Sequence, residues 1–343
     1  MENNMENNME NNIENNIENK NVKTNFCKVM EFNRAFDMVS QEPTEYSCYE
    51  EDSNGNIKYN PLKNIRKYIF VNCPSIIKLR LALIKEELDE LNDAIIDNNI
   101  IEQRDACADI LYVVYGMADV LGIAIDDYFN IKLQKNLEYY INNNLTNDFI
   151  DKTNLITNNF VNNSSQNLSN FQKIKSVASE MLGFNISSKT KLELIEIIKN
   201  NLYKAYSELE PNCYEKMCDN EELSLYLDDS IIINKFELVA NNIYDLLRWT
   251  YIMTIVIGVD ADSDFSIVHE SNMSKLCSTV EDAIKTVEDY RIKYDAGISP
   301  YDSPFYYYLP NLDKWIVKNS SSGKALKNIK YKKVNFSNPR FVF

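Results

Sequence analysis

The sequence predicts an all-α protein made of two related helical units, an internal duplication resembling a dimer, with a small β-hairpin or meander at its C-terminal end. Seven glycines and eight prolines in 343 residues are few, and scarce breakers favour long helices over a turn-rich β fold. Apolar residues recur at spacings of three and four, as on a helix face. Residues 291–343 instead carry alternating and β-branched runs around a Ser-Ser-Gly turn signal.

The composition indicates a soluble globular protein. Hydrophobic residues make up 45% of the chain and the formal net charge is −15, with a mean hydropathy of −0.38. This charge argues against a surface that binds a nucleic acid duplex. It suits a protein that holds divalent cations in clustered carboxylates.

The cysteines and the N-terminal residues favour a cytoplasmic, reducing location. The seven cysteines are an odd number without a CxxC pair, and the N-terminal residues are polar where a signal peptide would be apolar. We expect no membrane span, because the apolar stretch Leu246–Val259 is short and contains Arg248. The bias toward Asn, Ile and Lys is typical of an AT-rich genome, viral genomes included.

The first part of the chain divides into a tail and a helical unit. Residues 1–24 repeat the tetrapeptide MENN with small changes, which is typical of a disordered low-complexity tail. Residues 25–142 are expected to form a helical unit, with Gly122 as a helix C-cap and a loop over residues 41–61. Its predicted helices cover residues 25–40, 74–97, 100–121 and 125–142.

The remainder divides into a linker, a second helical unit and a basic end. Residues 143–170 are rich in Asn and Ser and are interpreted as a linker. The helical pattern resumes over residues 171–290, and residues 291–343 form the β-rich element. That element is locally basic, and it either covers a phosphate site, binds another partner or is a solvated appendix. Its lysines are Lys314, Lys318, Lys324, Lys327, Lys330, Lys332 and Lys333.

The two helical units are related by an internal repeat. Residues 105–129 align without a gap on residues 241–265, so that Gly122 meets Gly258 and Asp109 meets Asp245. The apolar frame persists in the second copy, but the acids at four aligned positions are absent from it. Chance alignment of two amphipathic helix pairs is the alternative. The replaced acids are Glu86 by Asn200, Glu87 by Asn201, Glu90 by Lys204 and Asp105 by Asn241.

The acids of the first copy have the spacing of a metal site. Glu86 and Glu90 are four residues apart and Glu87 and Glu90 three, so they share a helix face. Asp105 and Asp109 share a face of the next helix, which a short polar break places antiparallel to the first. Five carboxylates meeting between helices would repel one another without a cation, and oxygen ligands suit Mg²⁺, or alternatively Mn²⁺.

A solvated acidic face paired with Lys85 or Arg104 is the structural alternative. Asp109 argues against it, because this acid lies in the apolar run ADILYVVYG, where a buried carboxylate needs a partner. We therefore favour metal binding.

Several motifs together resemble the all-α nucleoside triphosphate pyrophosphohydrolases, the MazG-type and phosphoribosyl-ATP pyrophosphohydrolase superfamily. These are EELDEL, followed by DACADILYVVYGMADVLGI, with EFNRAFD at residues 31–37 and FSIVHESNMSKL at residues 265–276. The resemblance implies a helical, usually dimeric or tetrameric fold that binds Mg²⁺. It also implies hydrolysis of a nucleotide between its α- and β-phosphates, which yields a monophosphate and pyrophosphate.

The metal acids of the superfamily match four positions, and the layout departs from its pattern. Where the superfamily often has Glu three residues before the last Asp, this chain has Ala106, so Asp105 would have to serve. SNMSKL follows the second copy instead of the first. This layout predicts a covalent pseudo-dimer whose two copies share one site. It leaves open whether two whole chains also form a homodimer. The matching acids are Glu86, Glu87, Glu90 and Asp109.

The shared site would take substrate residues from two places. Asn272 and Lys275 of the second copy are expected to bind phosphate or a base edge, unless they form a solvent-facing helix end. Phe32 and Phe36 are expected to stack on a base, unless they belong to the helix core. One of the three glutamates would take the proton of a water, and Lys275 would hold the pyrophosphate charge. His269, the single histidine, is a weaker candidate base.

The predicted function is Mg²⁺-dependent cleavage of nucleoside triphosphates, without a nucleic acid duplex or a membrane as partner. Two alternatives stay open. One is phosphoribosyl-ATP hydrolysis, which uses the same fold. The other is a nucleotide- or metal-binding structural protein without turnover, which the displaced SNMSKL motif favours and the intact acids disfavour.

Overall fold

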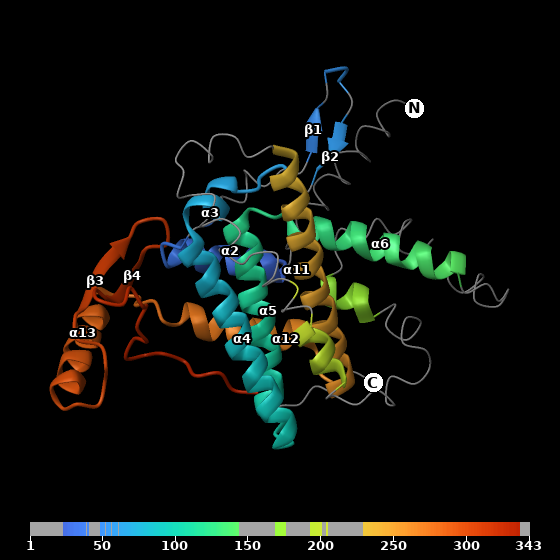
Figure 1. The fold of residues 1–343 in the computed structure, drawn as a ribbon. Coiled ribbons are helices and arrows are strands. Elements are labelled where there is room, and N and C mark those ends of the chain that lie inside the picture. Colours follow the sequence, from blue (N-terminus) through green and yellow to red (C-terminus); the bar gives the residue numbers. More distant parts are fainter. Residues whose placement is uncertain are drawn as a thin grey trace, which may run out of the picture.

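The computed structural model confirms a mostly helical protein with a small C-terminal antiparallel hairpin (Figure 1). The described parts of the chain are residues 23–38, 40, 49–51, 53–55, 57–60, 62–143, 169–175, 193–200, 204 and 229–336. The predicted N-terminal tail lies outside them except for residues 23 and 24, as does most of the predicted linker.

The elements follow one another from the N-terminal to the C-terminal side. The helices are α2 (Asn25–Ala35), α3 (Lys67–Asn72), α4 (Pro74–Ile96), α5 (Ile100–Leu121), α6 (Ile125–Asn143), α11 (Asp229–Ile257), α12 (Ala261–Met273) and α13 (Val280–Asp295). The strands are β1 (Tyr49–Glu51), β2 (Ile57–Tyr59), β3 (Pro304–Leu309) and β4 (Lys314–Asn319).

Helices α4 and α5 form the antiparallel hairpin that the sequence predicts. Pro74 occupies the first turn of α4, where its missing N–H costs nothing. The Asn99 side chain caps α5 by accepting hydrogen bonds from the backbone N–H groups of Ile101 and Glu102. The short connection lays the two helices side by side (Figure 1).

Gly122 ends α5 in the left-handed conformation, with φ of 72°, which confirms the predicted cap. A Cβ atom there would lie 2.1 Å from the Asn64 carbonyl oxygen. We expect Gly122→Ala to lower the free energy of unfolding by about 2–4 kcal/mol, from backbone strain plus this clash. Chemical denaturation measures it.

Gly323→Ala is the matched control, because Gly323 has φ of +68° and a Cβ atom added to it would have no neighbour within 4 Å. It carries the backbone strain alone, so it should cost less. Equal losses in the two variants would show that the Asn64 carbonyl does not restrict position 122.

Helix α5 is the centre of the helical body (Figure 1). It packs against α2, α4, α11 and α12, and the middle of the helix is buried almost all round. Where α5 meets α11, the hydroxyl oxygens of Tyr115 and Tyr251 lie 2.8 Å apart. These two tyrosines occupy aligned positions of the predicted repeat, so equivalent residues of the two predicted copies contact each other at the middle of the body.

Two asparagines, Asn25 and Asn170, hold this tyrosine pair through equivalent sets of hydrogen bonds, which we call clasps. The Asn25 amide donates to the Tyr251 hydroxyl over 3.4 Å and to Asp262 over 2.7 Å. The Asn170 amide donates to the Tyr115 hydroxyl over 3.0 Å and to Asp126 over 2.7 Å. Each asparagine therefore satisfies one buried tyrosine and one half-buried carboxylate.

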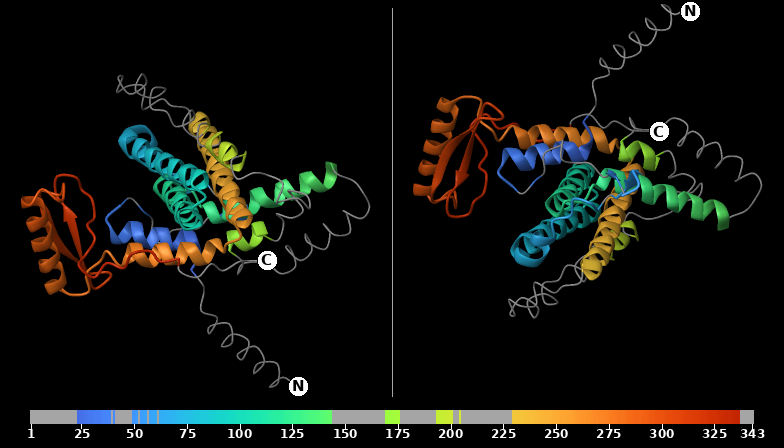
Figure 2. Two further views of the ribbon diagram at one scale, coloured as in Figure 1. Left: turned by 90° about the horizontal axis from the view of Figure 1, so that it is seen from below. Right: turned by 90° about the horizontal axis from the view of Figure 1, so that it is seen from above.

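The C-terminal element lies at one end of the helical body and contains α13, β3 and β4 (Figure 2). Strands β3 and β4 pair antiparallel, with Tyr307 opposite Ile316. Phe36, Leu276 and Ile316 share a buried apolar cluster that joins α2 and the end of α12 to the hairpin. This contact fixes the basic element beside the ends of both helices.

Three features differ from expectation or extend it. Residues 49–59, within the predicted loop, contain the antiparallel pair β1 and β2 around the Ser-Asn-Gly turn. Helix α2 ends at Ala35 because Asp37 adopts a left-handed φ of 52°. In the described parts of the chain, only α5 with the first part of α6 reaches the length and apolarity of a membrane span, and that pair is bent by 107°.

Candidate functional site

The acids of α4 lie on the face of that helix that turns away from its core contacts. Ile84, Leu88 and Leu91 are buried, so helical spacing leaves Glu86 and Glu90 exposed and Glu87 half-buried at the boundary. Glu87 is the acid of α4 that points most toward the interior.

The acids of α5 approach those of α4 from the opposite side. Asp109 is half-buried, and the Oδ1 atom of Asp105 is buried without a hydrogen-bond partner. A buried, unpaired carboxylate oxygen is costly unless a cation or donor meets it. Glu87 and Glu90 of α4 are close enough to Asp105 and Asp109 of α5 for their charges to interact.

Mutual repulsion and burial perturb these carboxylates. Burial first, and then the charges of Asp109 and Glu90, raise the pKa of Glu87 to about 8. Burial and the charge of Asp105 raise the pKa of Asp109 to about 7, although the Lys275 ammonium opposes the rise. Burial likewise raises the pKa of Asp105. Near neutral pH, Glu87 holds a proton for much of the time.

The donor set fits a hard divalent cation. Carboxylates are the ligands that Mg²⁺ and Mn²⁺ prefer. The pKa values are raised by burial first and then by the neighbouring carboxylates, and a cation beside them and the unpaired Asp105 oxygen would offset both effects. In the described part of the chain, however, no three Asp, Glu, His or Cys side chains are arranged so that they could hold a metal ion as they stand. The acids are close enough for their charges to interact. Their side chains would have to adopt other rotamers to contact one ion together.

Helix α12 brings Asn272 and Lys275, two residues of the predicted second copy, to this place. Lys275 follows the end of α12 and interacts electrostatically with Asp109, while its ammonium donates to the Asn272 side-chain oxygen over 2.7 Å. Asn272 also interacts with the Tyr112 side chain on α5, where it opposes the rise that burial causes in the pKa of Tyr112. Burial and the neighbouring Lys327 lower the pKa of Lys275 to about 8.

The two predicted stacking residues on α2 have different surroundings. Phe32 is half-buried, with the Lys275 ammonium 5.7 Å from its ring centre and the Tyr112 ring edge-on at 5.5 Å. Phe36 is 2% exposed and packs against Phe32 at 4.3 Å. Phe32 therefore lies beside Lys275 and Tyr112, and Phe36 packs against it from the core.

Tyr112 and His269 line the same region, and Tyr112 was not predicted. The Tyr112 hydroxyl lies 3.1 Å from His269 Nδ1, and burial lowers the pKa of His269 to about 4. A neutral imidazole tied to a phenol is a hydrogen-bonding group that holds no charge at neutral pH. Tyr112 lies three residues beyond Asp109, on the same helix face, which is the signal in the sequence that could have identified it.

Lysines of the C-terminal element reach the rim of the site. The charges of Lys327 and Lys324 add to the lowering of the Lys275 pKa that burial causes. The charge of Lys333 opposes the rise that burial causes in the pKa of Asp105. The basic character of this segment is visible in the sequence, but which lysines approach the acids depends on how the hairpin docks on α2 and α12.

Comparison with known proteins bears on this arrangement. Residues 72–136 match the phosphoribosyl-ATP pyrophosphohydrolase family, and this range contains every predicted metal acid. The chain is 28% identical over 316 residues to an uncharacterized protein of Acanthamoeba polyphaga mimivirus, an alignment that covers 92% of this chain and 94% of that protein. No solved structure matches significantly.

The family match supports a hydrolase function of the nucleotide pyrophosphohydrolase type. It covers α4, α5 and the first part of α6, the elements that carry and enclose the acids. Residues 72–136 therefore match a phosphoribosyl-ATP pyrophosphohydrolase domain, which is consistent with the all-α nucleoside triphosphate pyrophosphohydrolase superfamily that the sequence motifs resemble.

Proposed function

We propose that this protein hydrolyses nucleoside triphosphates between the α- and β-phosphates with the help of Mg²⁺ or Mn²⁺. The observation that carries the proposal is the juxtaposition of the carboxylates of α4 and α5 with Lys275 and Asn272. Carboxylates suit a cation, a lysine suits a phosphate, and the two occur side by side.

The acids and Lys275 have different roles in the proposed reaction. Glu86, Glu90, Asp105 and Asp109 would hold the cation, which when bound neutralises phosphate oxygens and lowers the pKa of a water. Glu87, in its deprotonated form, which the positive charge of a bound cation would favour, would take the proton of the water that attacks the α-phosphorus. The bond from that phosphorus to the bridging oxygen breaks, and Lys275 stabilises the charge on the departing pyrophosphate.

Phe32 and Asn272 orient the nucleotide. The half-buried Phe32 ring offers an apolar surface to a base, and Asn272 is held by Lys275 and Tyr112. Residues fixed in this way keep the substrate aligned with the acids, which lowers the entropic part of the barrier.

We further propose that the chain is a covalent pseudo-dimer whose first copy performs the chemistry. The contact of Tyr115 with Tyr251 and the reciprocal clasps by Asn25 and Asn170 support it. In the second copy, burial raises the pKa of Asp245, and the charges of Arg248 and Lys204 oppose this rise, so Asp245 lies among cations. Basic side chains there occupy surroundings that in the first copy are acidic.

Lys275→Ala tests the shared site. We expect pyrophosphate release to fall about 10- to 100-fold, because one cation is lost beside the departing phosphates. Lys135→Ala, which removes an exposed lysine of α6, should leave the rate unchanged. Catalytic efficiency that is equal in both variants would place the second copy outside the active site.

A panel of nucleotides with Mg²⁺ tests the substrate class. We expect pyrophosphate release from nucleoside triphosphates. Phosphoribosyl-ATP is a second candidate substrate, because the matched family is named for its hydrolysis. Release from phosphoribosyl-ATP alone would favour that candidate, and release from no member of the panel would refute both.

A further inference from the structure

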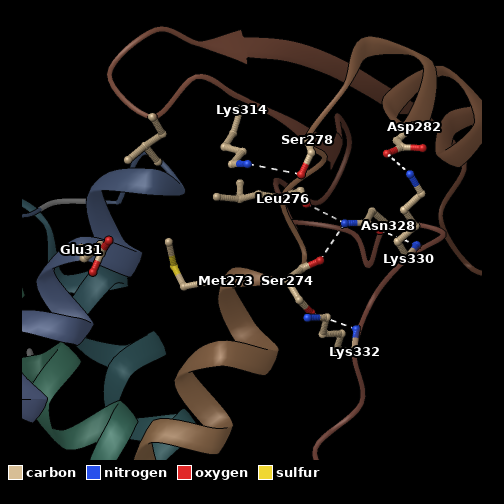
Figure 3. Close-up of a pocket in the computed structure, with 11 residues that line it drawn as sticks. Glu31, Met273, Ser274, Leu276, Ser278, Asp282, Lys314, Asn328, Lys330 and Lys332 are labelled. Carbon is tan, nitrogen blue, oxygen red and sulfur yellow. Dashed lines mark hydrogen bonds and ion pairs between the residues drawn. The ribbon is translucent and has the colours of Figure 1, made fainter.

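A cavity of about 470 Å³ lies between the helical body and the C-terminal element, outside the acid cluster (Figure 3). Glu31 of α2 stands on one side of it, and the chain that follows β4 stands on the other. Its volume is in the range of small-molecule sites. Its polar lining includes Ser274, Ser278, Lys314, Asn328, Lys330 and Lys332.

The cavity wall contains lysines whose charge is not compensated. Residues 314–333 include no Asp or Glu, although the whole chain carries a net charge of −15. Within the described residues, Lys314 and Lys332 form no ion pair; the Lys314 ammonium donates to the Ser278 hydroxyl over 3.2 Å. This part of the cavity therefore has a positive charge without a counter-ion.

The two acids of the wall are already paired. Asp282 accepts a hydrogen bond from the Lys330 ammonium over 2.7 Å, and Glu31 pairs with Lys23 at 2.8 Å. Their negative charges are therefore largely neutralised, and they do not cancel the charges of Lys314 and Lys332.

The backbone that carries these groups is fixed before any ligand arrives. The Asn328 amide donates to the carbonyl oxygens of Ser274 and Leu276, over 2.6 and 2.7 Å. The backbone N–H of Lys332 donates to the Ser274 hydroxyl over 2.9 Å, as Figure 3 shows. A backbone fixed in this way allows an anion to bind without the cost of ordering a loop.

We propose that this cavity binds a phosphate-bearing anion through Lys314, Lys332 and the Ser278 hydroxyl. Lysine ammonium groups and a serine hydroxyl donor are suited to phosphate oxygens. The anion is either free pyrophosphate or the phosphate end of a nucleotide, whose remainder would lie against the apolar wall formed by Met273, Leu276 and Leu312. The proposal needs neither the acids of α4 and α5 nor a metal ion.

Calorimetric titration of the full chain tests it, with EDTA present so that binding at a metal centre is suppressed. The probes are inorganic pyrophosphate and a nucleoside monophosphate. We expect pyrophosphate to bind, and Lys314→Gln combined with Lys332→Gln to weaken binding at least about tenfold through the loss of two charged contacts. Lys332→Gln alone, at an exposed position, should give an intermediate loss and keeps the fold intact.

The controls separate this cavity from the candidate active site. Lys135→Gln combined with Lys293→Gln changes the net charge equally at exposed positions and should not alter the affinity. Lys275→Ala should also retain binding. Monophosphate binding that depends on Lys314 and Lys332 would identify a nucleotide as the source, and binding of pyrophosphate alone would identify the free anion. Unchanged affinity in the double variant, no binding by the unmodified chain, or loss confined to Lys275→Ala would overturn the proposal.

Discussion

Glu87→Gln should lower pyrophosphate release at least about 100-fold, because it removes the proposed base and keeps the shape of the side chain. Glu87 is the acid of α4 closest to the interior, and its pKa of about 8 arises from burial and from Asp109 and Glu90. A glutamine at this position cannot accept the proton of the attacking water.

The same variant should stabilise the metal-free protein at alkaline pH. A carboxyl whose pKa is higher in the folded than in the unfolded state favours folding when protonated, so its contribution is lost as pH rises from about 4.5 to about 8. Asp109, with a pKa of about 7, acts in the same direction. The melting temperature of the metal-free chain should therefore fall between pH 6 and 8, and it should fall less in Glu87→Gln.

Asp93→Asn is the control for both measurements, because Asp93 is an exposed acid on the same helix. It should change neither turnover nor the pH dependence of melting. Wild-type turnover in Glu87→Gln would exclude Glu87 as the base, and an unchanged pH dependence would show that its carboxyl is not perturbed by its neighbours.

Arg104→Met should lower the free energy of unfolding by about 3–5 kcal/mol, because it leaves a buried carboxylate without its partner. Arg104 and Asp264 are 3% and 2% exposed and share two hydrogen bonds, of 2.9 and 2.6 Å. Arg104 also donates to the Phe336 carbonyl oxygen over 3.1 Å. One guanidinium therefore ties α5 to α12 and to the segment that follows the hairpin.

A double substitution separates the effect of the unpaired Asp264 charge from the effect of packing around Arg104. Arg104→Met combined with Asp264→Leu removes both charges, and we expect it to recover much of the lost stability. Lys85→Met, in an exposed pair with Asp89, should cost less than about 1 kcal/mol. Urea denaturation measures all three. A double variant as unstable as Arg104→Met would show that packing around Arg104, and not the unpaired charge of Asp264, causes the loss.

Local signals in the sequence predict most of the helical body. Pro74 at the start of α4 and Gly122 after α5 mark the ends of the hairpin, and the structure has α4 and α5 there. Strands β1 and β2 could not be predicted in this way, because three residues each are too few to show an alternating pattern.

The clasp at Asn170 depends on tertiary structure. Asn170 belongs to an Asn-rich tract that is typical of a linker, and only the fold brings it to Tyr115 and Asp126. A signal is nevertheless present in the sequence, because TNFCK at residues 24–28 resembles SNFQK at residues 169–173. Asn25 and Asn170 stand at equivalent places in the two pentapeptides.

The arrangement of the candidate site could likewise be predicted from the sequence only in part. Helical spacing predicts that Glu87, Glu90 and Asp109 share one space, and their mutual effects on pKa agree with that. Spacing cannot predict that Lys275, far along the chain, reaches Asp109, or that Phe36 is covered by the hairpin. The internal duplication and the metal ion stay predictions.

Product analysis after incubation of the full chain with a nucleoside triphosphate and Mg²⁺ tests the central claim most directly. The proposed function predicts a nucleoside monophosphate and pyrophosphate in equal amounts, with EDTA abolishing both. A nucleoside diphosphate with orthophosphate, or the same products in the presence of EDTA, would contradict it.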